Sequence, residues 1–242
     1  MTIHVLSDVE VWFAEHRLRG AMNSAALNDG VDVQEVTVFG DTGKRRIAGL
    51  HDSELSVEGY YDSAIDKALY DNLALANVPV TLAPLGSVAG DRAYLMRALA
   101  GEYAPGAGVG EPFGFSFACS LSAGDKLTRG VIGHNGTVIV DGTGLAINLG
   151  AIAAGQRLSA SLHVLSFTNG DPTAITIESD DAQGFGSPIT RVTFDNVAAV
   201  GAQFKTLLTA VADTWWRVKW DVPAAGGPSV QFVVALGIGS NF

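Results

Sequence analysis

Short segments in which apolar and polar residues alternate recur along the whole chain, and they constrain the fold more than any other feature. A period of two is typical of strands with one buried face. In the first part of the chain these segments are 31–39, 79–83, 113–121 and 137–140, and in the second part they are 158–167, 174–178, 189–194, 215–222 and 230–236. The chain is therefore predicted to be mainly β.

One segment has helical spacing instead. Between Tyr61 and Ala74, apolar residues recur at intervals of three and four, and Asp62 or Ser63 can cap the helix at its N-terminus. The pattern predicts one helix near residues 62–74. Residues 91–100 fit either a helix or a half-buried strand, and we favour a strand.

The composition changes after Asn135-Gly136, a pair that favours a hairpin turn. Beyond this point charged residues become sparser, and aromatic and β-branched residues become more frequent. We place a domain boundary near residue 140. Residues 1–140 are predicted to form a β-sandwich or barrel with the helix, and residues 141–242 a second antiparallel β-sandwich of jelly-roll type.

The charge of the chain excludes some classes of function. Fifteen Lys and Arg residues stand against 25 Asp and Glu residues, for a formal net charge of −10. Such a chain offers no strong basic stripe for phosphates, so tight nucleic-acid binding is not expected. No apolar run approaches the roughly 20 residues of a membrane span, so no membrane association is expected.

No motif for catalysis, metal binding or cofactor binding is found, and we predict that the chain is not an enzyme and has no cofactor. The five histidines are scattered, with no His-x-x-x-His, and no Gly-x-Ser-x-Gly occurs. Cys119 and His163 lie in alternating runs, as a buried thiol and a hydrogen-bonded strand residue would. Residues 178–181 hold the densest carboxylate cluster, which fits calcium ligation or, as we favour, a solvated turn.

Three tryptophans lie close together near the C-terminus. Trp215, Trp216 and Trp220 could form a platform for stacking sugars. Trp216 and Trp220, however, fall on the same face of a strand, which is typical of core residues. We favour the core and keep sugar binding as an alternative.

The order of elements in the first part resembles that of a known family. The segment 36–50 reads as a strand, a polar loop and a second strand, and it is followed by Glu58-Gly-Tyr-Tyr-Asp62 and the helix. Residues 79–84 and Gly90-Asp91 continue the likeness. Over roughly residues 20–135 the chain resembles the major tail tube proteins of long-tailed bacteriophages.

This resemblance implies a structural virion protein that assembles in the host cytoplasm and resides in the tail. Copies would close into rings, and the rings would stack into a tube through which DNA passes. One tube fold per chain implies hexameric rings with the second domain as outer decoration, and two tube folds imply trimeric rings. The implied partners are the tape measure, tail terminator and baseplate proteins. The alternative is another phage β-structural protein, a capsid decoration or a sugar-binding tail component.

The polar loop at residues 40–46 is the candidate stacking element under this resemblance. Asp41, Lys44, Arg45 and Arg46 would then contact the adjacent ring. The alternative is an ordinary solvated hairpin tip. The acidic composition also suits a DNA channel, because a negative lumen repels phosphates.

Overall fold

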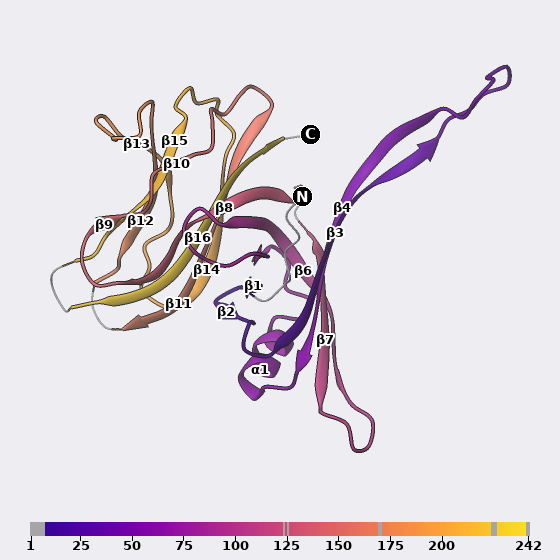
Figure 1. The fold of residues 1–242 in the computed structure, drawn as a ribbon, viewed down its shortest axis with the longest axis horizontal. Coiled ribbons are helices and arrows are strands. Elements are labelled where there is room, and N and C mark those ends of the chain that lie inside the picture. Colours follow the sequence, from indigo (N-terminus) through magenta and orange to yellow (C-terminus); the bar gives the residue numbers. More distant parts are fainter. Residues whose placement is uncertain (1–7, 123, 125, 169–170, 224–226, 241–242) are drawn as a thin grey trace.

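The computed structural model describes residues 8–122, 124, 126–168, 171–223 and 227–240, and this part of the chain is mainly β with one helix (Figure 1). The predicted fold class is confirmed. The elements are β1 (Glu10–Phe13), β2 (His16–Arg17), β3 (Met22–Glu35), β4 (Arg46–Tyr60), α1 (Ser63–Asp71), β5 (Val78–Ala83), β6 (Arg92–Gly106), β7 (Gly114–Leu121), β8 (Thr128–Val138), β9 (Gly142–Thr143), β10 (Ile147–Asn148), β11 (Gln156–Thr168), β12 (Ala174–Asp180), β13 (Ile189–Thr193), β14 (Gly201–Leu207), β15 (Trp215–Asp221) and β16 (Ser229–Ser240).

Most strands belong to one large antiparallel sheet. Its main path runs β14-β11-β16-β8-β6-β5-β1-β2, and β7 joins β6 to β4, on which β3 is paired. A smaller sheet has the order β10-β15-β12-β13, with β9 paired to β15. The large sheet combines strands from before and after residue 140, so hydrogen bonding does not stop there. The domain boundary near residue 140 therefore stays a prediction.

The hydrophobic residues gather in three buried clusters. One holds Trp216, Trp220 and Phe232, and it is built from the smaller sheet and from β11 and β16 of the large sheet. A second, with residues such as Phe13 and Phe117, is built from β1, β4, β5, β6, β7 and α1. A third, around Trp12, includes residues of β5, β6, β8 and β16, where the large sheet curls upon itself. These clusters hold the two sheets and the helix in one body.

The helix forms where the sequence predicts it. The Asp62 carboxylate accepts hydrogen bonds from the backbone N–H groups of Ala64 and Ile65, at 2.9 and 3.2 Å, as an N-cap residue does. Gly59 just before it is required by packing, because a Cβ there would lie 2.1 Å from the carbonyl oxygen of Ala21. The Gly-aromatic-aromatic-Asp step thus combines a close approach of two backbones with a helix start.

Two local expectations are wrong. Asn135 and Gly136 do not turn but continue β8, opposite Val233 and Phe232 of β16. The long pairing partner outweighs the local preference of an Asn-Gly pair for a turn. The many Gly and Pro residues of 103–112 favour a loop, but this loop is shorter than expected, because β6 continues to Gly106 in pairing with β7. The other segments predicted to be strands, including residues 92–100, contain strands in the structure. Two of them are shorter than predicted, because β3 ends at Glu35 within 31–39 and β8 ends at Val138 within 137–140.

Candidate assembly surface

The most prominent feature of the molecule is a long hairpin that projects from the body (Figure 1). It is formed by β3 and β4, which pair from Met22 opposite Gly59 to Glu35 opposite Arg46. Strand β7 supports β4 only from Glu54 to Tyr60. Residues 30–52, which we call the arm, are therefore a two-stranded ribbon beyond the support of the sheet.

Local hydrogen bonds shape the tip of the arm. The Val36 N–H donates to the carbonyl oxygen of Arg45 at 2.9 Å. The Asp41 carboxylate accepts from the Val38 N–H at 3.1 Å, and the Asp41 N–H donates to the carbonyl oxygen of Val38 at 3.1 Å. Between them Gly40 has a φ of 102°, a conformation that favours glycine. The tip is therefore a defined turn.

The structure brings the four predicted stacking residues together at this tip. Asp41 is used within the turn, and the Lys44 ammonium forms an exposed ion pair with Glu35 at 2.9 Å. No ion pair is recorded for the side chains of Arg45 and Arg46 within the described part of the chain. Both are exposed, so the tip carries cationic groups that are available to another molecule.

The arm also exposes apolar side chains, which the sequence did not place. Phe39 is fully exposed, and Val33, Val38 and Leu50 are 63%, 60% and 80% exposed. The alternation in residues 31–39 suggested a strand with a buried face, but no described part of the body covers Val33 or Val38. A gathering of exposed apolar residues is a mark of an interaction site.

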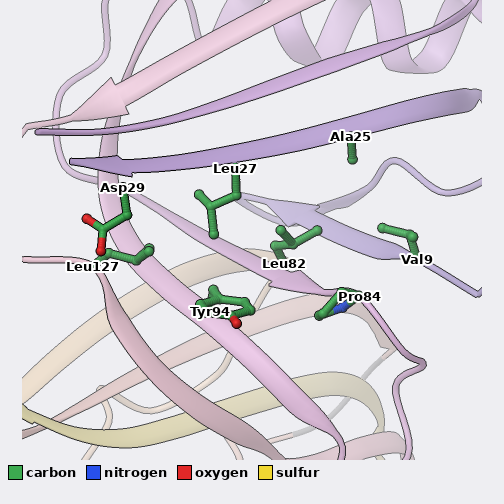
Figure 2. A pocket seen from close by; sticks show the side chains of 8 residues that line it. All are labelled: Val9, Ala25, Leu27, Asp29, Leu82, Pro84, Tyr94 and Leu127. Carbon is green, nitrogen blue, oxygen red and sulfur yellow. The ribbon is translucent and has the colours of Figure 1, made fainter. Parts of the chain in front are cut away.

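An apolar cavity opens at the base of the arm, and we call it the base cavity. It has a volume of about 500 Å³. Figure 2 shows the side chains of β3 on one side of it and those of β5 and β6 on the other. Its lining residues are Val9, Ala25, Leu27, Asp29, Leu82, Pro84, Tyr94 and Leu127. The Asp29 carboxylate, which accepts a hydrogen bond from the Ser53 hydroxyl at 2.8 Å, is the charged group of this lining.

A flat acidic surface lies beside the arm on strands β4, β7 and β6. Glu54 and Glu58 alternate with the buried residues Leu55 and Val57, so both point away from the core. Glu102 lies in register with Ala118 of β7, which in turn pairs with Ser56. The three glutamates are exposed and share one face with small residues.

The tryptophans do not line a common exposed platform. Trp216 and Trp220 are buried, and their indole N–H groups donate to the carbonyl oxygens of Gly150 and Val140 at 2.9 and 3.1 Å. Only Trp215 is partly exposed. Trp216 and Trp220 are thus core residues, as their even spacing in the sequence indicated.

The carboxylate cluster at residues 178–181 is not the solvated turn that we favoured, because Glu178 and Asp180 are buried in β12. Glu178 is buried and paired with Arg217 at 2.8 Å, and the Asp180 carboxylate accepts from the backbone N–H groups of Ala182 and Ser187. Among the described residues, no three His, Cys, Asp or Glu side chains gather as a metal site would require. In the same residues, no helix has the length and apolar character needed to cross a membrane.

Comparisons with known proteins add only weak similarities. No protein-family model matches the chain, and no curated protein matches it. A chain of the native gene transfer agent virion is 10% identical, with a TM-score of 0.39, over 52% of this chain and 98% of that one.

Two further solved structures give similar values. A chain from the tail of the empty gene transfer agent particle, refined with C6 symmetry, is 8% identical, with a TM-score of 0.35, over 45% of this chain and 81% of that one. The SPP1 Dit protein, described as a hub of the adsorption apparatus in phages that infect Gram-positive hosts, is 9% identical, with a TM-score of 0.38, over 96% of this chain and 99% of that one. At these identities and TM-scores, function has to be argued from the residues of this chain.

Proposed function

We propose that the chain is a structural subunit of a bacteriophage tail, which closes into rings that stack into the tail tube. The observation that carries this proposal is the arm, which projects from the body beyond the part of β4 that β7 supports (Figure 1). The resemblance over residues 20–135 implies a ring-stacking element at residues 40–46, and these residues form the tip of the arm.

The energetics of the arm argue that it has a partner. A two-stranded ribbon in water is only marginally stable by itself. This ribbon also leaves Val33, Phe39 and Leu50 in solvent, which costs about 25 cal/mol for each Å² of apolar surface that a partner could cover. Contact with a neighbouring copy would remove both disadvantages.

The exposed edges of the molecule suit ring closure. Among the described strands, β3 is paired on one side only, with β4, and β14 is paired in the sheet only with β11. Unpaired strand edges promote pairing with other chains, and closure into a ring satisfies them. We propose hexameric rings with residues 141–242 on the outside, and trimeric rings if this second part serves as another tube fold.

The acidic face suits the lumen of such a tube. Glu54, Glu58 and Glu102 would repel the phosphates of DNA in transit, so that the polymer slides instead of adhering. This role requires no catalysis and no cofactor. Tape measure, tail terminator and baseplate proteins would be the partners within the virion.

Electron microscopy in negative stain, over a concentration series of the purified protein, tests the proposal. Rings or hollow tubes are expected, and their symmetry distinguishes six copies from three. Monomers at every concentration, including in the presence of tail ends isolated from the virion, would overturn it.

A further inference from the structure

We propose that the base cavity receives the arm tip of a second copy of this chain, with the ring of Phe39 inserted among its apolar residues. This inference rests on the proposed function, since it names the surface to which the arm binds in a stack.

The chemistry of the cavity matches the tip. Ala25, Leu27, Leu82 and Leu127 offer apolar surface to a side chain that has none in its own molecule. An aromatic residue buries about 150–250 Å² on insertion, and a cavity of about 500 Å³ has room for the ring and for part of its neighbours. Figure 2 shows the leucine side chains pointing into this space.

The arm cannot fill the cavity of its own molecule. Asp29 lines the cavity, and the pairing of β3 with β4 continues from Asp29 to Glu35, which at about 3.3 Å per residue places Glu35 roughly 20 Å away. Phe39 lies four residues beyond Glu35, in the tip. An arm tip that occupies the cavity would therefore come from another molecule.

The charges of the arm tip and of the cavity lining favour a second copy of this chain as the other molecule. Lys44, Arg45 and Arg46 place three of the fifteen cations of an acidic chain in one short segment. The Asp29 carboxylate stands on the lining of the cavity. When Phe39 enters the cavity of a neighbour, the guanidinium groups that follow it in the loop come close to this carboxylate.

The contact is also of the kind that builds a stack. The tip and the base cavity are different surfaces of one molecule, so their contact is heterologous and repeats from copy to copy. The length of the arm would set the repeat along the stack.

Disulfide trapping tests the inference, and the chain is well suited to it. Its single cysteine, Cys119, is buried, and burial raises the pKa of its thiol to about 12, so it stays unreactive in the folded protein. Phe39→Cys is combined with Ala25→Cys, which faces the cavity. The matched control combines Phe39→Cys with Ala26→Cys, the next residue of β3, which points to the opposite face and pairs with Ser56.

Mild oxidation of assembled protein should give a ladder of disulfide-linked oligomers with Ala25→Cys and none with Ala26→Cys. Tubes that form without the Ala25→Cys ladder would overturn the inference and leave the proposed function standing. Failure of the unmodified protein to assemble would instead overturn the proposed function.

If Phe39→Cys itself prevents assembly, a second pair of variants tests whether the base cavity is the receiving site. Ala25→Phe fills the base cavity and should raise the protein concentration needed for assembly at least tenfold, whereas Ala26→Phe should not. Circular dichroism would verify that both variants are folded. Equal effects of the two substitutions would count against the base cavity as the receiving site.

Discussion

The imidazole Nδ1 of His163 lies 2.6 Å from the carbonyl oxygen of Ala14, which joins β11 to the turn after β1 across 149 positions of the sequence. A carbonyl oxygen only accepts, so Nδ1 carries the proton. Nε2 then accepts a hydrogen bond from the Thr81 hydroxyl at 2.8 Å. The Thr81 oxygen in turn accepts from the Ser161 hydroxyl at 2.7 Å. The neutral imidazole therefore bridges two layers of the curled sheet.

This arrangement predicts that stability falls at acid pH. Burial lowers the pKa of His163 from 6.5 to about 4, so between these values the unfolded chain binds more protons than the folded one. The contribution is fully present above pH 6.5 and is lost as the pH falls towards 4. Between pH 8 and pH 5 it amounts to about 2 kcal/mol of unfolding free energy.

Urea unfolding of the wild type and of His163→Gln at pH 8 and pH 5 measures this effect. The variant should be less stable at pH 8 and should lose less stability on acidification. Burial also lowers the pKa of His134, but His134 is present in both proteins and cancels in the comparison. Equal losses in the two proteins would contradict the assigned role of His163.

The tryptophan cluster gives a second prediction. Trp216→Ala should lower the unfolding free energy by about 3–5 kcal/mol, because it empties a core site and leaves the Gly150 carbonyl oxygen without its donor. Trp215→Ala, next to it on the partly exposed face, should cost only about 1 kcal/mol. Urea unfolding of the two variants compares adjacent positions of one strand. Similar losses of unfolding free energy in the two variants would contradict the structure, in which Trp216 is buried and Trp215 is partly exposed.

These residues illustrate what the sequence could and could not predict. The helix was predictable because its signals are local, namely the Asp62 cap and the spacing of Ala68 and Leu69, both of which are buried. Likewise, the even spacing of Trp216 and Trp220 assigned them to one face of a strand.

The features that depend on distant segments were not predictable. Alternation in residues 31–39 indicates two faces, but whether another element covers either face is decided elsewhere in the chain. Asn135 and Gly136 continue a strand only because β16, about a hundred positions later, supplies the partner. The base cavity combines residues of β3, β5 and β6 with residues of three segments outside the strands, so no single segment of the sequence predicts it.

The cations of the arm give a third prediction. Arg45→Glu combined with Arg46→Glu should abolish stacking, since the tip would repel the Asp29 carboxylate at the base cavity of a neighbour. The thermal midpoint should barely change, because exposed substitutions shift the unfolding free energy by about 0.5 kcal/mol or less. Analytical ultracentrifugation and electron microscopy measure assembly.

The matched control reverses two cations away from the arm, Lys67 and Lys219, whose ion pairs with Asp71 and Asp221 are exposed. Such pairs contribute little to stability, and this variant should assemble as the wild type does. If it lost assembly to the same extent, the effect would reflect net charge and not the arm.

The acidic face leads to the last prediction. Replacing Glu54, Glu58 and Glu102 by lysine exchanges three negative groups of one exposed face for positive ones. If this face lines the lumen, the variant should still form tubes, because the three side chains make no contact with the core. Short duplex DNA should then be retained by the tubes at low salt and released as salt is raised, as counterion release requires. Co-sedimentation of labelled DNA with tubes over a salt series measures the retention.

The control must carry the same total charge at positions outside the channel. Asp181, Asp195 and Asp221 are exposed residues of the second part, and their replacement by lysine changes the net charge by the same amount. Open-ended tubes with a lysine-lined lumen would enclose DNA, so nuclease added after loading should spare it. DNA bound to lysines on the outside should be digested, as bound DNA on the control variant would be. Nuclease-sensitive DNA on both variants would mean that the Glu54 face looks outwards, and the lumen would then have to be formed by another face of the sheet.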